Sequence, residues 1–138
     1  MSAVRVSFGN TGVKLDVMTM KHVFLTFALS CTMLAADAVV DQARKKIAEK
    51  KYDEAIAQLE TANKAKPTAE LKKALTDANM AKADAFMNDA SAPPRVKYTT
   101  ALRAYREVLK YDKTNKKAQE SISTIEGIYK SMGRPVPQ

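Results

Sequence analysis

Apolar side chains recur every three or four positions along most of the chain after residue 36, which is the spacing of one face of an α-helix. Val39, Ala43 and Ile47 begin this series, and it continues to Ile125 and Tyr129 near the C-terminus. No stretch of this region keeps up the alternation of apolar and polar residues that is typical of a half-buried strand. The pattern therefore predicts an all-α fold with helices over 37–50, 53–66, 68–89, 94–112 and 114–132.

Residues that begin or end helices stand at the borders of these segments. Proline cannot continue a helix interior, so Pro67 and the proline pair at 93–94 mark two of the breaks. The connections between the helices are short, and consecutive helices are therefore expected to be antiparallel neighbours. The residues expected to begin helices are Asp53, Glu54, Thr68 and either Thr114 or Asn115, and Gly133 is expected to end the last helix.

The residues before this region predict an export signal. Residues 20–36 begin with a basic pair, continue with about a dozen uncharged and mostly apolar residues, and end in small residues. This is the layout of a secretory signal peptide, and the apolar run is shorter than the roughly 20 residues that a membrane-spanning helix needs. Cleavage is expected after Ala36 or Ala38, and a buried core helix is the alternative interpretation.

Two features of this segment leave alternatives open. Signal peptides normally start the chain, so we interpret residues 1–19 as an extension ahead of a true translation start at Met20 or Met18. Cys31 follows a small residue, as the cysteine of a lipoprotein signal does, but Leu29 lies one position later than that pattern requires. A lipid anchor at Cys31 is therefore the less favoured alternative to a thiol that is removed with the signal. The mature chain, residues 37–138, is expected to be periplasmic or secreted.

Two segments of the helical region resemble each other. Each has a tyrosine, an alanine three residues later, an aliphatic residue next, and further apolar residues at intervals of three. This pattern resembles the tetratricopeptide repeat (TPR), a family of helical hairpins in which a small residue lets the two helices pack closely. The residues that carry the resemblance are Tyr52, Ala55, Leu59, Ala62 and Pro67 in the first unit and Tyr98, Ala101, Tyr105 and Val108 in the second.

The resemblance implies a specific arrangement of the helices. It implies two antiparallel TPR-like hairpins plus a C-terminal capping helix, about five helices that form a short right-handed solenoid. The sequence departs from the family in its spacing, because Tyr52 and Tyr98 lie 46 residues apart whereas the family repeats every 34 or so residues. The extra residues are expected in a long third helix and in the loop that follows it.

The composition of the mature region argues against catalysis. The whole chain has a net charge of +8, and residues 37–138 keep 20 basic and 14 acidic side chains, a net +6, but no His and no Cys. Imidazole bases, thiol nucleophiles and their metal complexes are therefore excluded there. The paired carboxylates of Asp53 and Glu54 are explained by the helix dipole. We expect no enzyme activity, no cofactor and no metal.

What remains is recognition by surface shape. In repeat proteins of this kind the first helix of each unit lines a concave surface, which often binds peptides. By that resemblance, the partner-binding groove is expected at Arg44, Lys72, Thr76, Asn79, Gln119 and Ser123. These side chains are polar and slightly basic, which suits a protein or peptide partner with acidic groups. The alternatives are a structural module of an envelope complex and, less favoured, a basic protein that binds nucleic acid or a membrane surface.

Overall fold

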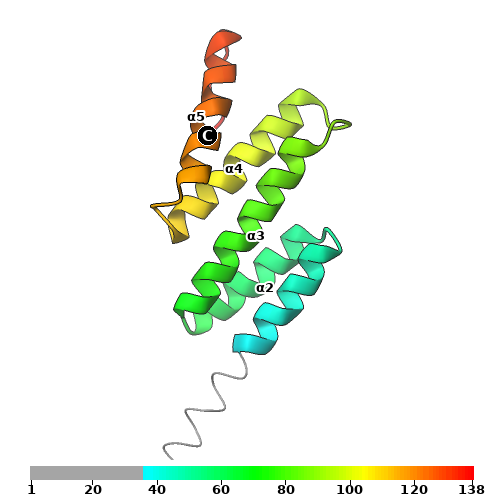
Figure 1. Ribbon diagram of the computed structural model, residues 1–138, viewed down its shortest axis with the longest axis vertical. Helices are drawn as coiled ribbons and strands as arrows, with labels where there is room; N and C mark the ends of the chain where they lie inside the picture. The colour runs from blue at the N-terminus through cyan, green and yellow to red at the C-terminus, as the bar shows by residue number, and fades with distance from the viewer. Residues whose placement is uncertain (1–35) are drawn as a thin grey trace, which may run out of the picture. The chain divides into compact units, whose positions relative to one another are not determined.

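The computed structural model describes residues 36–138. Within this range the fold is all-α: helices are joined by short loops, and there are no strands. The predicted signal peptide over 20–36, the extension over 1–19 and Cys31 lie outside the described residues, apart from Ala36. Five helices are present in the described range, and their ends agree with the prediction to within two residues (Figure 1). They span 36–48, Tyr52–Ala65 (α2), Ala69–Asn88 (α3), Pro94–Tyr111 (α4) and Lys116–Ser131 (α5).

Two of the predicted helix starts are confirmed by hydrogen bonds from their capping side chains. The side chain of Thr68 accepts from the backbone N–H of Leu71 at 3.1 Å, so it caps α3. Of the two candidates for α5, Asn115 is the cap, and its Oδ1 accepts from the N–H of Ala118 at 3.1 Å. Each cap satisfies an N–H group that has no partner within its own helix.

Gly133 ends α5 in the way that its sequence position predicts. Its φ is +65°, a value that glycine adopts without steric cost. The N–H of Gly133 donates to Lys130, and the N–H of Arg134 donates to Tyr129. These two bonds make a Schellman motif, which turns the chain back at the end of the helix.

Each helix packs against the next one along the chain, and Figure 1 shows consecutive helices that run in opposite directions. The first helix and α2 are joined by an ion pair between Lys46 and Glu54 at 3.4 Å and by a bond from Gln58 to Gln42 at 2.6 Å. Among α2 to α5, the most extensive contact is that between α3 and α4. The predicted antiparallel hairpins are therefore present in the described range.

The buried side chains form two clusters that share α3. We call the first the N-terminal core; it joins the first helix, α2 and the first half of α3 and contains Val40, Ala43, Ala55, Leu59, Leu71, Leu75 and Ala78. We call the second the C-terminal core; it joins the end of α3 to α4 and α5 and contains Ala83, Ala101, Leu102, Ala104, Tyr105, Val108, Ala118, Ile125 and Tyr129. Alanines at the helix contacts let the backbones approach closely.

The residues that resemble the TPR pattern face these two cores. Ala55 and Leu59 are buried in the N-terminal core, with Ala62 packed against it. Ala101, Tyr105 and Val108 are buried in the C-terminal core. Tyr52 and Tyr98 are half-buried, and Pro67 is exposed just after the end of α2. This burial explains the similar spacing of the two segments, while membership of the family and the right-handed solenoid stay predictions.

Candidate functional site

Three of the predicted groove residues line two neighbouring hollows on the surface of α3. Between the first helix and α3 lies a hollow of about 100 Å³ that Arg44 lines together with Val40 and Ile47. A larger hollow of about 510 Å³ lies between α3 and the connection from α4 to α5, and Lys72 and Thr76 line it. Lys73 and Asp77 line both hollows, so the two lie next to each other. We call this surface the α3 groove.

The other three predicted groove residues lie elsewhere. Asn79 is only 3% exposed, and its Nδ2 donates to the carbonyl of Leu75 at 2.9 Å, so it is part of the helix packing rather than of an open surface. Gln119 and Ser123 are exposed on α5, but neither lines the α3 groove. The side chain of Gln119 donates to the carbonyl of Lys113 at 2.8 Å.

The charges along the α3 groove are balanced. Arg44 pairs with Asp41 at 3.1 Å, and Lys73 pairs with Asp77 at 2.9 Å. Glu70 also lines the groove and supplies a further negative charge. The slight basic character that the sequence predicts for this surface is therefore offset by carboxylates from the first helix and from α3.

Asp112 adds another fixed negative charge at the edge of the groove. Its Oδ1 accepts from the side chain of Thr114 at 2.8 Å and from the backbone N–H of Thr114 at 3.1 Å, and its Oδ2 accepts from Asn115 at 3.2 Å. These bonds, first among them that of the Thr114 hydroxyl, hold the pKa of Asp112 below its ordinary value. The carboxylate fixes the turn between α4 and α5, and it lies beside Tyr111 in the groove.

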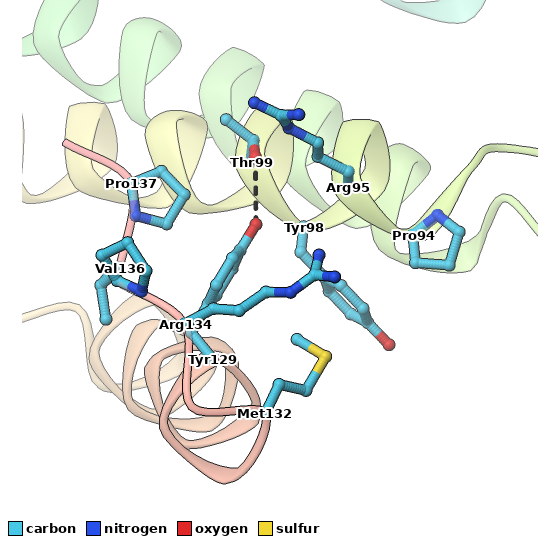
Figure 2. Close-up of a pocket in the computed structure, with 10 residues that line it drawn as sticks. Pro94, Arg95, Tyr98, Thr99, Tyr129, Met132, Arg134, Val136 and Pro137 are labelled. Atoms are coloured by element: carbon cyan, nitrogen blue, oxygen red, sulfur yellow. Dashed lines mark hydrogen bonds between the residues drawn. The ribbon is translucent and has the colours of Figure 1, made fainter.

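A second cavity, which the sequence does not predict, lies where the C-terminal tail folds back over α4. We call it the C-terminal pocket, and its volume is about 410 Å³. Figure 2 shows side chains from three elements gathered around it: the start of α4, the end of α5 and the tail. The lining residues are Pro94, Arg95, Tyr98, Thr99, Tyr129, Met132, Arg134, Pro135, Val136 and Pro137.

Long-range contacts hold the tail that forms one wall of this pocket. The Schellman motif at Gly133 turns the chain, and Val136 packs against the C-terminal core. Arg106 donates to the carbonyl of Pro137 at 2.6 Å while its other terminal nitrogen pairs with Glu126 at 3.1 Å. Sequence reasoning missed the pocket because it identified the glycine and the prolines of the tail, but it had no signal for where the tail returns.

A hydrogen bond between two helices closes the inner side of the C-terminal pocket. The hydroxyl groups of Tyr129, on α5, and Thr99, on α4, lie 3.1 Å apart (Figure 2). The remaining wall is mostly apolar, and the two arginines Arg95 and Arg134 are its only charged residues. An aromatic and proline-lined wall with two cations suits an apolar ligand that carries a negative charge.

The titratable groups with shifted pKa values lie in ion pairs, turns and the core. Burial, and then the hydrogen bond to Asp84, raise the pKa of Tyr105 to about 12.

Within residues 36–138 there is no group of three or more acidic, His or Cys side chains that could hold a metal ion. In the same range no helix is long and apolar enough to cross a bilayer.

No family model, no curated protein and no solved structure matches this chain.

Proposed function

We propose that residues 37–138 are an exported, TPR-like adaptor without catalytic activity, which binds a partner protein or peptide in the α3 groove. The observation that carries the proposal is that Arg44, Lys72 and Thr76, which were selected from the sequence alone, line two adjacent hollows that share Lys73 and Asp77. They come from the first helix and from α3, the helices that open the two hairpins. In helical repeat proteins such a surface is the usual binding face.

The chemistry of the groove suits an extended peptide. The walls contributed by Ile47 and Tyr111 are partly apolar, and the rims carry donors such as Lys72 and Thr76. The groove has both positively and negatively charged side chains, so a peptide that fits it would itself carry both acidic and basic residues. This modifies the expectation of a purely acidic partner for this groove.

Ion pairing across the surface argues for this function over general binding to polyanions. Eight basic side chains, among them Arg44 and Lys117, already pair with carboxylates within the described residues. A protein that binds the backbone phosphates of a nucleic acid usually concentrates unpaired basic residues on one face.

The proposed location, the periplasm or the outside of the cell, rests on the pattern of residues 20–36, which precedes the helices.

A capture experiment with a charge-reversed groove tests the proposal. The chain from Asp37 onward is immobilised, an envelope fraction is passed over it, and the retained proteins are quantified by mass spectrometry. The Arg44→Glu/Lys72→Glu variant is expected to lose the specific partner, with its affinity reduced about tenfold or more. Far-ultraviolet circular dichroism checks that the variant keeps its helices.

The matched control changes the same charges outside the groove. Lys45 and Lys64 are exposed, line neither hollow and make no ion pair with any residue in the range 36–138. The Lys45→Glu/Lys64→Glu variant should therefore retain the partner. If both double variants release it equally, and binding falls steeply with salt, the protein binds through general electrostatics and the groove proposal is wrong.

A further inference from the structure

The C-terminal pocket shares no residue with the α3 groove, and its chemistry is different. We propose that it is a second binding site, which takes an extended segment of a partner protein in which an apolar side chain stands next to a carboxylate. This inference stands independently of the proposed groove, because different residues carry it.

The apolar part of the ligand is inferred from side chains that the fold leaves open to solvent. Met132 lines the pocket and is 49% exposed. Within the range 36–138 it is one of two large apolar side chains exposed to this degree, and the other, Val96, does not line the pocket. With Tyr98, Met132 offers an apolar surface beside a cavity of about 410 Å³, a volume that accommodates one or two side chains of a ligand.

The carboxylate is inferred from charge complementarity. Arg95 and Arg134 line the pocket, and neither forms an ion pair with another residue of the described range. In Figure 2 the Arg134 side chain reaches from the tail toward Tyr98, whereas the Arg95 side chain runs along α4 on the side away from Arg134. A guanidinium group can bind a carboxylate through two parallel hydrogen bonds, and it does so best next to an apolar surface that excludes water.

The start of α4 reinforces this positive charge. Both α2 and α3 carry acidic residues in their first turns, whereas α4 has none and also lacks a side-chain cap. The positive end of its helix dipole is therefore not neutralised by its own side chains, and it adds to the field of the two arginines.

The form of the wall favours a peptide chain as the occupant. One side of the pocket is the irregular backbone of residues 134–137, which Arg106 and Val136 fix in place. Prolines and tyrosines provide flat, rigid contact surfaces at little entropic cost, and extended peptides commonly bind to such surfaces.

Fluorescence anisotropy with the purified chain and three labelled ten-residue peptides tests the proposal. The first peptide has a central Leu-Phe pair flanked by aspartates, the second has lysines in place of the aspartates, and the third has serines in place of Leu-Phe. The first peptide is expected to bind at least tenfold more tightly than either of the others. Equal binding of the first two peptides, or no binding of the first, would overturn the proposal.

Variants then locate the site. Arg134→Glu is expected to weaken binding of the first peptide by about tenfold or more, and Met132→Ser is expected to weaken it too. The matched control is Arg103→Glu, because Arg103 is an exposed arginine of α4 that does not line the pocket. The proposal is wrong if Arg134→Glu binds like the wild type, or if Arg103→Glu loses as much affinity. Reversal of Arg44 and Lys72 in the α3 groove should leave this peptide's affinity unchanged.

Discussion

At the scale of single residues, Tyr105 and Lys117 both bind Asp84, and these two polar contacts connect three helices. The tyrosine is 2% exposed, and its hydroxyl donates to Oδ1 of Asp84 on α3 at 2.7 Å. The other oxygen of Asp84 accepts from Lys117 at the start of α5. A tyrosine among apolar residues thus keeps its hydroxyl satisfied, and Asp84 links α3, α4 and α5.

The raised pKa of Tyr105 makes stability depend on pH in a predictable direction. In the folded state the pKa is about 12, whereas in the unfolded chain it is about 10. The contribution of the tyrosine is therefore complete below pH 10 and declines as the pH rises toward 12, since only the unfolded state releases the proton in that interval.

Comparison with Tyr105→Phe isolates this effect from the titration of the lysines. At pH 8 the variant is expected to be about 1–2 kcal/mol less stable to urea, because Asp84 loses a hydrogen bond. The difference should shrink steadily between pH 10 and 11.5. Tyr52→Phe is the control, because Tyr52 makes no side-chain hydrogen bond to a residue of the described range and should show a smaller loss at pH 8. A difference for Tyr105→Phe that stays constant with pH would contradict the assignment.

At the scale of the helices, ends can be predicted from the sequence where the chemistry is local. Thr68, Asn115 and Gly133 act within a few residues of their own positions, so residue type predicted Thr68 and Gly133 and narrowed the cap of α5 to Thr114 or Asn115. The end of the first helix is different. Lys50 has a φ of 62°, and the N–H groups of Lys50 and Lys51 donate to Ile47 and Lys46. This is a second Schellman motif, and it escaped prediction because a lysine stands where glycine is usual.

Replacing this lysine with glycine is expected to stabilise the protein. A left-handed backbone costs an ordinary residue roughly 1–2 kcal/mol, and glycine avoids this cost. The greater freedom of glycine in the unfolded chain lowers the resulting gain in stability by about 0.5–1 kcal/mol. Lys50→Gly should therefore raise the free energy of unfolding in urea by about 0.5–1 kcal/mol. Lys45→Gly, an exposed position inside the same helix, should lower it by about 1 kcal/mol. Destabilisation by both substitutions would show that Lys50 is not strained in solution.

The sites could be predicted only in part from the sequence, because helical spacing shows which side chains face outward but not which distant segments pack together. Helical spacing predicted which residues of the first helix and α3 face outward, and Arg44, Lys72 and Thr76 do share a surface. The same spacing did not reveal that Asn79 is buried where α3 passes between the two cores. The C-terminal pocket depends on Arg106, which lies 31 residues before the carbonyl that it binds, and no local pattern indicates that contact.

At the scale of the whole helical domain, α3 is the element that joins the two cores. Its first half contributes Leu71 and Leu75 to the N-terminal core, and its second half contributes Ala83 to the C-terminal core. If one core opens, α3 loses half of its packing, and the other core loses a rigid neighbour. We therefore expect the two cores to unfold together, as neighbouring units of short repeat proteins often do.

Hydrogen exchange after a substitution in one core tests this coupling. Leu59→Ala removes a fully buried side chain from the N-terminal core and should cost about 2–5 kcal/mol. The protection of amides in α5, which the substitution does not touch, should fall by as much as that of amides in α2. Ile125→Ala in the C-terminal core should produce the reciprocal loss in α2. Unchanged protection in α5 after Leu59→Ala would mean that the cores are independent.

The folded-back tail, residues 134–137, is short, but it forms part of the C-terminal pocket. Because residues 134–137 are one wall of the C-terminal pocket, a variant without them would lose this binding surface and keep all five helices of the described range. An affinity tag attached after Gln138 would lie beside the same pocket, so a tag for studies of binding is better attached at the other end.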